Sequence, residues 1–191
     1  MDKIKLKDIP NIITCFRIFL VAPFSYFMLK ENYTIAFYIF FLSGFSDGID
    51  GILARKLNCQ SRFGEIADPL ADKLLVVTSA LLLTYLGKLP VWLFSLIIIR
   101  DLILIIGATI WNFLFEHVEV VPTWISKFNT TMQIFMIVVL LFELAYKELP
   151  PEFIFMVLML TAITTLLSFI DYMYTWGKIA ANKKNLKNPN E

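Results

Sequence analysis

The sequence predicts an all-α integral membrane protein with six transmembrane helices. Of its 191 residues, 58% are hydrophobic, and the mean hydropathy is +0.71, so the chain is more apolar than an ordinary soluble domain. The apolar residues gather in stretches of about twenty residues or more, the length that a helix needs to cross a bilayer. Short connections separate them, so we expect antiparallel neighbours in one membrane-embedded domain over residues 1–191.

The first half of the chain begins with residues 1–10, where lysines alternate with apolar residues. This pattern is typical of an amphipathic segment that lies on a membrane surface. The first three membrane helices are predicted at residues 11–29, 33–56 and 64–86.

The second half is predicted to hold the other three helices. The fourth begins at Pro90, because proline suits the first turn of a helix, and ends near residue 115. The fifth covers residues 123–146 and the sixth residues 151–178. The remaining stretch, 178–191, is rich in lysine and asparagine and is predicted to be a mobile basic tail.

Lysine and arginine are unevenly divided between the two predicted membrane faces, and this division sets the orientation. One face holds the N-terminal and C-terminal lysines, Arg17 and the cations of residues 55–62, whereas the other holds Lys30, Lys88 and Lys147. We therefore expect both termini and the loop between the second and third helices to face the cytoplasm.

Four aspartates stand on a fixed spacing within this apolar sequence. With small residues and an arginine they form the pattern D-x2-D-G-x2-A-R-x8-G-x3-D-x3-D, which consists of Asp47, Asp50, Gly51, Ala54, Arg55, Gly64, Asp68 and Asp72. Helical spacing puts the first pair of aspartates on one face of the second helix and the second pair on one face of the third. Because a short loop joins these helices, the carboxylates are predicted to converge at the cytoplasmic face.

Such a convergence favours a metal site. Each carboxylate inside a membrane costs about 2.5–3.5 kcal/mol, and close like charges add to that cost. An oxygen-only ligand set favours Mg²⁺, Mn²⁺ or Ca²⁺, and no cysteine or histidine belongs to the pattern, so zinc is not expected. Four carboxylates suffice to bind two metal ions, and two such ions can bind the phosphate group that a nucleophile attacks. The alternative, solvated helix ends, accounts for one aspartate pair only.

Small residues accompany the aspartates. Gly48, Gly51 and Ala54 on the second helix, and Gly64 on the third, leave the backbone uncovered. A flat group such as a nucleobase can approach a backbone of this kind. The alternative is close helix–helix packing, which is common in membranes.

The pattern resembles, at all eight positions, the signature of the CDP-alcohol phosphatidyltransferase family. Upstream, Pro10, Asn11, Thr14 and Arg17 are similar to the family's P-N-x-x-T-x-x-R opening. Downstream, D-P-L-A-D-K, which ends at Lys73, is similar to members that make glycerol-based phospholipids. The six-helix plan agrees with that family's fold.

The resemblance implies transfer of a phosphatidyl group from CDP-diacylglycerol to an alcohol, with release of CMP and with two Mg²⁺ or Mn²⁺ ions as cofactors. It implies that Asp47, Asp50 and Asp68 bind one ion, that Asp47, Asp68 and Asp72 bind the second, and that Asp72 is also the general base. It implies that Gly51, Ala54 and Gly64 line the cytidine site, with Asp50 and Arg55 near the nucleotide. Members are typically homodimers, so a homodimer is expected, and no nucleic acid is expected as a partner.

Three further cations, Arg100, Lys127 and Lys73, are candidates for binding a phosphate on the acceptor alcohol. Buried cations in membrane helices usually pair or bind ligands. For Arg100 the alternative is a local ion pair with Asp101 or Asp171. For Lys127 the alternative is snorkelling to the membrane interface.

Two alcohols are candidates for the acceptor. Phosphatidylglycerophosphate synthases of the family often show G-K-x-K-T at the start of the fifth helix, whereas this chain has Ser126-Lys127-Phe128-Asn129-Thr130. With Gln133 and Arg100-Asp101, this region looks more like the family's cardiolipin synthases. Replacing a lysine suits a phosphodiester, which has one negative charge, so phosphatidylglycerol is favoured and glycerol 3-phosphate is the alternative.

Two other functions use similar residues. An intramembrane prenyltransferase also binds diphosphates through aspartates and Mg²⁺, but such enzymes are generally larger and lack this glycine-alanine-arginine-glycine arrangement. A cation transporter or channel predicts carboxylates distributed along a pore, whereas these cluster at one membrane face.

Overall fold

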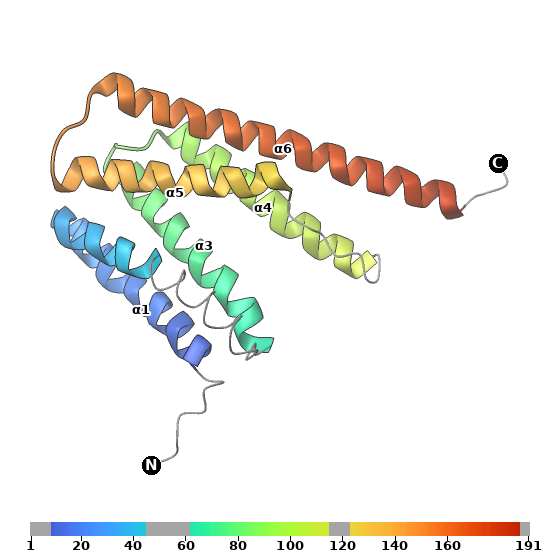
Figure 1. The fold of residues 1–191 in the computed structure, drawn as a ribbon, viewed down its shortest axis with the longest axis horizontal. Coiled ribbons are helices and arrows are strands. Elements are labelled where there is room, and N and C mark those ends of the chain that lie inside the picture. The colour runs from blue at the N-terminus through green and yellow to red at the C-terminus, as the bar shows by residue number, and fades with distance from the viewer. Residues whose placement is uncertain (1–8, 45–61, 115–122, 188–191) are drawn as a thin grey trace, which may run out of the picture. The chain divides into compact units, whose positions relative to one another are not determined.

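The structure is a computed structural model that describes the backbone of residues 9–44, 62–114 and 123–187. It describes the side chains of residues 16–44, 73–107 and 123–175. Helices and the turns between them make up these ranges, which confirms the all-helical prediction for them (Figure 1). The helices are α1 (Ile9–Leu29), Tyr33–Gly44, α3 (Arg62–Tyr85), α4 (Val91–Leu114), α5 (Trp124–Ala145) and α6 (Pro151–Lys187).

The turn after α1 explains why the next helix begins at Tyr33. Glu31 has a positive φ of 59°, which lets the Asn32 N–H donate to the Phe27 carbonyl at 2.9 Å. This pattern closes the C-terminus of a helix. The Asn32 side chain then accepts a hydrogen bond from the Ile35 N–H at 3.4 Å and caps the following helix.

The turn after α3 works in the same way but uses a glycine. Gly87 has a φ of 72°, a conformation that glycine adopts without the steric penalty of a side chain. The Lys88 N–H donates to the Leu83 carbonyl at 2.9 Å. Pro90 follows, and its carbonyl accepts from the Phe94 N–H at 3.1 Å, so proline precedes the first full turn of α4.

The predicted end of the last helix at residue 178 is corrected by the structure, in which α6 continues to Lys187. The added segment contains no proline and is rich in alanine and lysine, which favour helix. Gly177 does not interrupt the helix, and Pro189 is the first strong helix breaker beyond residue 151. The helical part of the predicted tail is therefore an extension of α6.

The chain divides into two compact units. The first comprises residues 1–89 and 137–149, and the second comprises residues 90–136 and 150–191. In the first unit α1 packs against α3. Buried Phe24 of α1 also contacts Phe40 of the following helix, with ring centroids 6.1 Å apart.

The last part of α5 is held in the first unit by aromatic and polar contacts. The ring centroid of Phe37 lies 6.2 Å from that of Phe142 and 5.5 Å from that of Tyr146. Lys88 forms an ion pair with Glu143 at 3.4 Å. These contacts tie α5 to the turn after α3 and to helix Tyr33–Gly44. In the second unit, α4 packs against α6.

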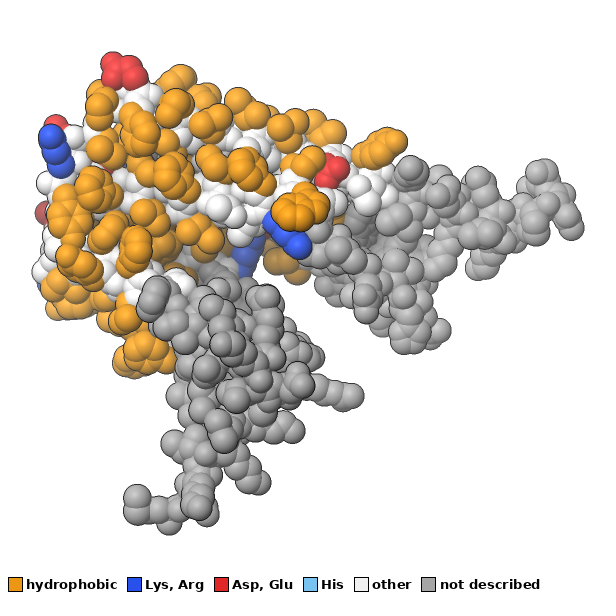
Figure 2. All heavy atoms as spheres, viewed as in Figure 1, with side chains coloured by type: hydrophobic (Ala, Val, Ile, Leu, Met, Phe, Trp, Pro, Cys, Tyr) orange, Lys and Arg blue, Asp and Glu red, His pale blue; other side chains and the backbone are white. Residues whose placement is uncertain are grey.

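Two described segments are long and apolar enough to cross a membrane, Trp124–Ala145 and Pro151–Thr175. The other apolar segments in the described residues are shorter: Phe16–Leu29, Tyr33–Gly44 and Lys73–Tyr85. Many exposed side chains are large and apolar, and Figure 2 shows hydrophobic side chains spread over the visible described surface. An apolar surface of this extent suits lipid contact. Six membrane crossings stay a prediction.

Candidate active site

The first half of the aspartate pattern lies outside the described residues. This applies to Asp47, Asp50, Gly51, Ala54 and Arg55. Their predicted roles in metal and nucleotide binding stay predictions.

The second half of the pattern lies on α3. Gly64, Asp68 and Asp72 occupy successive turns near the N-terminal end of this 24-residue helix. Because side chains four residues apart share a helix face, Asp68 and Asp72 stand on one side of α3. Carboxylates in this relation match the oxygen ligands that Mg²⁺ and Mn²⁺ prefer. The backbone therefore fits the proposed metal chemistry, while the described side chains elsewhere form no group of three or more metal-ligating residues.

Helix α1 brings a buried cation to the same unit. Asn11 and Thr14 lie on α1, and Arg17, one turn later, is 1% exposed. A buried guanidinium in an apolar unit requires negative or polar groups around it. Because α1 packs against α3, its arginine belongs to the helix pair that carries two of the four aspartates. Its predicted support of the site stays a prediction.

Arg100 forms a second polar centre inside the second unit. Its Nη1 donates to Asp101 Oδ1 at 2.8 Å. Its Nη2 donates to Ser126 Oγ on α5 and to Ser168 Oγ on α6, both at 2.6 Å. The arginine and the aspartate are 3% and 4% exposed. The structure thus shows the local ion pair with Asp101 that was the alternative interpretation of Arg100.

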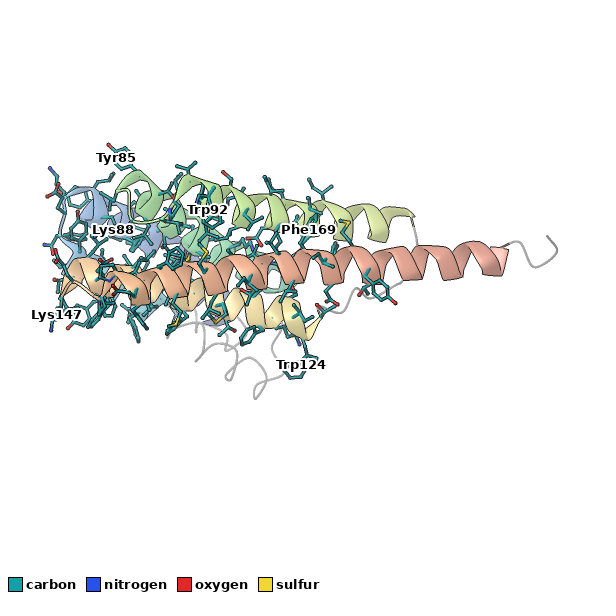
Figure 3. All side chains as sticks on the ribbon, turned by 90° about the horizontal axis from the view of Figure 1, so that it is seen from above. Tyr85, Lys88, Trp92, Trp124, Lys147 and Phe169 are labelled. Carbon is teal, nitrogen blue, oxygen red and sulfur yellow. The ribbon has the colours of Figure 1, made fainter. Side chains whose placement is uncertain are left out.

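Lys127 lies one turn into α5 and is exposed. Its Nζ stands 5.8 Å from the ring centroid of Trp124, which is itself 87% exposed and projects from the first turn of α5 (Figure 3). The indole face attracts the ammonium group without removing its charge. Lys73, the residue after Asp72, is half-buried, and its predicted contact with the acceptor stays a prediction.

A buried polar seam joins α5 and α6, and sequence reasoning missed it. The hydroxyls of Thr164 and Thr165 each donate to Asn129 Oδ1 at 3.0 Å. Asn129 is 0% exposed and Gln133, one turn later on α5, is 1% exposed. The α6 side of the seam consists of Thr161, Thr164, Thr165 and Ser168, all buried. Their spacing of three and four residues was a helical signal that could have revealed this face.

Comparison with known proteins matches the chain to one family. The sequence model described as CDP-alcohol phosphatidyltransferase matches residues 7–170. This range includes the whole aspartate pattern, Arg17, and the polar centre around Arg100.

Individual relatives of two kinds are similar to the chain. The cardiolipin synthase (CMP-forming) of Rattus norvegicus is 32% identical over 186 residues, covering 89% of this chain and 61% of the relative. The human protein of that name is also 32% identical, with 62% of the relative covered. The CDP-diacylglycerol–glycerol-3-phosphate 3-phosphatidyltransferase of Haemophilus influenzae is 33% identical over 175 residues, covering 87% of this chain and 91% of the relative. The chain thus spans about six tenths of the two cardiolipin synthases.

Proposed function

The chain belongs to the CDP-alcohol phosphatidyltransferase family, and from this premise we propose that it transfers a phosphatidyl group from CDP-diacylglycerol to an alcohol and releases CMP. The observation that carries the proposal is the continuous helix α3, which sets Gly64, Asp68 and Asp72 on successive turns. This is the arrangement that the second half of the family's signature requires.

The aspartates bind the two metal ions as the resemblance implies. Asp47, Asp50 and Asp68 hold one divalent cation, and Asp47, Asp68 and Asp72 hold the second. When bound, two Mg²⁺ or Mn²⁺ ions neutralise the pyrophosphate and stabilise charge on the leaving CMP. Gly51, Ala54 and Gly64 admit the cytidine, with Asp50 and Arg55 beside the nucleotide.

Asp72 is the general base in this proposal. Its carboxylate accepts the proton of the acceptor hydroxyl as the hydroxyl oxygen attacks the phosphorus that bears diacylglycerol. A new P–O bond to the alcohol forms, and the P–O bond to CMP breaks. CMP leaves with the oxygen that bridged the two phosphorus atoms of the pyrophosphate. Asn11, Thr14 and Arg17 support the site from α1, which packs against α3.

Phosphatidylglycerol is the acceptor that the charges of the second unit favour. Asp101 offsets the charge of Arg100 at 2.8 Å, and Asn129 is neutral. Of Arg100, Lys127 and Asn129, Lys127 is therefore the residue with a positive charge that no ion pair to a described residue offsets. A phosphodiester carries one negative charge, whereas glycerol 3-phosphate carries nearly two. The relatives include proteins named for each product, so their names support both acceptors equally. Glycerol 3-phosphate is therefore the second candidate.

Location and assembly follow from the same reasoning. The excess of lysine and arginine at the chain ends and at residues 55–62 supports an active site that faces the cytoplasm, with both termini on that side. The family's usual assembly supports a homodimer.

The test is a transfer assay with purified protein in liposomes. CDP-diacylglycerol labelled in its cytidine is mixed with Mg²⁺ and with phosphatidylglycerol or glycerol 3-phosphate, and the lipid product is identified by mass spectrometry. We expect CMP release to depend on the acceptor, with cardiolipin formed faster than phosphatidylglycerophosphate. Absence of CMP release with either alcohol contradicts the reaction, and faster formation of phosphatidylglycerophosphate contradicts the choice of acceptor.

A further inference from the structure

The C-terminal part of α6 is a basic segment that the proposed reaction does not use. Helix α6 continues without a break from Pro151 to Lys187 (Figure 1). Its apolar part, Pro151–Thr175, is long enough to cross a membrane. The remaining residues, 176–187, include Lys178, Lys183, Lys184 and Lys187. No aspartate or glutamate stands between residues 172 and 190, so the segment carries four positive charges and no negative one.

These four lysines decide the sign of the chain's net charge. The whole chain carries a formal charge of +1, and without the four lysines it would carry −3. The positive excess is therefore concentrated in one short segment rather than spread over the chain. A local excess of this kind indicates a partner with negative charge at that place.

Helix geometry keeps the segment close to the membrane surface. A helix rises about 1.5 Å per residue, so Lys178 lies about 4.5 Å beyond Thr175 along the axis, Lys184 about 14 Å and Lys187 about 18 Å. The apolar part of α6, about 38 Å long, exceeds a hydrocarbon core of about 30 Å. A longer helix fits such a core by tilting, and this tilt lowers the heights by about a fifth.

The resulting heights match the range of the electrostatic attraction. The headgroup layer occupies roughly the first 5–8 Å above the hydrocarbon core. A surface charge acts across a further Debye length of about 8 Å at physiological ionic strength. Lys178 thus stands within the headgroup layer, and Lys183, Lys184 and Lys187 stand within about one Debye length of it.

Stabilisation of the helix end is the structural alternative for these lysines. Cations are favourable at the C-terminus of a helix, but the effect is confined to the last turn. It applies to Lys184 and Lys187 and does not account for Lys178. Lys183 and Lys187 are four residues apart and share a helix face, where like charges repel each other. An anionic surface would relieve this repulsion.

We propose that residues 176–187 of α6 bind the anionic headgroup layer of the bilayer that α6 crosses, and that they enrich anionic phospholipids around this end of the helix. Four lysines directly after a membrane-spanning helix suffice for such binding. Recognition is by charge, so phospholipids with a net negative headgroup are ligands and phosphatidylcholine is not. A soluble acidic partner is less favoured, because the lysines stand within a few turns of the membrane surface.

Trp176, at the start of the segment, gives a measure of the lipids around it. Full-length protein is placed in phosphatidylcholine liposomes that contain brominated phosphatidylserine or brominated phosphatidylcholine at the same fraction, since brominated chains quench tryptophan fluorescence on contact. The chain has four tryptophans, so the signal of Trp176 is the difference between the wild type and Trp176→Phe.

The wild-type chain is expected to prefer the anionic lipid at low ionic strength. The relative association constant of phosphatidylserine against phosphatidylcholine should be at least about fivefold, the value of one lysine near an anionic surface. In 1 M salt, where the Debye length is about 3 Å, the preference should fall to near one.

Substitutions assign the preference to the lysines. Changing all four to glutamine should abolish it, and the pair Lys183→Gln with Lys184→Gln should at least halve it, while the helix is kept because the two residue types have similar helix propensities. Lys183→Arg with Lys184→Arg keeps the charge and should keep the preference. The matched control is Lys30→Gln with Lys147→Gln, which removes the same charge from exposed positions of the first unit and should change nothing.

Three results overturn the proposal. Equal quenching of wild-type Trp176 by the two lipids would mean that the lysines do not bind the bilayer and serve a soluble acidic partner instead. A preference that survives the change of all four lysines would come from another part of the chain. A preference for brominated phosphatidylglycerol without one for phosphatidylserine would show recognition of one lipid, since a charged surface does not distinguish lipids of equal charge. The measurement needs no turnover, so a chain that releases no CMP contradicts the proposed function alone.

Discussion

Arg100 and Asp101, consecutive residues of α4, form a buried ion pair at 2.8 Å. The same guanidinium donates to Ser126 on α5 and to Ser168 on α6. One arginine therefore joins three helices of the second unit, and an adjacent carboxylate cancels its charge. An arginine held in this way stabilises the helices that carry Lys127 and Asn129.

The ion pair makes a prediction about stability. Replacing Asp101 alone with leucine leaves a buried guanidinium without its counter-charge, which is expected to destabilise the protein by about 3–5 kcal/mol. The double variant Arg100→Leu with Asp101→Leu removes both charges and should recover part of the loss. Melting temperatures in detergent, followed by tryptophan fluorescence, measure this.

The ion pair of Lys88 and Glu143 is the comparison for that experiment. The Lys88 side chain is 36% exposed, so the change Glu143→Leu should cost about 1 kcal/mol or less. A double variant at residues 100 and 101 that is no more stable than the single Asp101→Leu variant would show that the lost counter-charge is not the cause.

The proposed base gives a prediction about turnover. Asp72→Asn keeps the size of the side chain but cannot accept the proton, so kcat is expected to fall by at least about 10²–10⁴. The melting temperature and most of the affinity for the nucleotide should be retained. CMP release and nucleotide binding are measured on the same preparation. Glu152→Gln, in the exposed first turn of α6, is the control, and turnover near the wild-type value in Asp72→Asn refutes the assignment.

The helix positions were predictable because local signals mark their ends. Gly87 and Pro90 stand between α3 and α4, and Pro151 begins α6, so both the predicted and the observed helices change at these residues. The predicted end of α6 is wrong because lysine and asparagine are typical of a mobile tail. The absence of proline between Pro151 and Pro189 is the stronger signal, and it favours a continuing helix.

The polar interior was less predictable than the helices. The pairing of Arg100 with Asp101 was an open alternative because the two are neighbours in sequence. Its contacts with Ser126 and Ser168 depend on which faces of α4, α5 and α6 meet. In a membrane protein the lipid-facing and inward-facing sides are both apolar, so hydrophobic periodicity does not identify the inner face. A search for polar residues at helical spacing is the better guide.

Metal dependence is the next prediction. Since all the proposed metal ligands are carboxylates, chelation by EDTA should stop CMP release, and added Mg²⁺ or Mn²⁺ should restore it. Zinc should restore less, because the pattern contains no histidine or cysteine. The assay is CMP release over a titration of each metal after dialysis. Full activity in the absence of divalent ions contradicts the metal site.

Lys127 is expected to set the affinity for the acceptor. Its exposed ammonium lies 5.8 Å from the Trp124 ring. Because Lys127→Ala removes this cation, it should raise the KM for phosphatidylglycerol by about tenfold and change the KM for CDP-diacylglycerol by less than about twofold. Lys127→Arg should retain most of the affinity, because it preserves the charge. Lys88→Ala is the control, since that lysine pairs with Glu143 in the other unit. The measurement is initial rate against each substrate in turn. Equal increases for both substrates would show that Lys127 anchors the helix end through its lipid contacts rather than binding the acceptor.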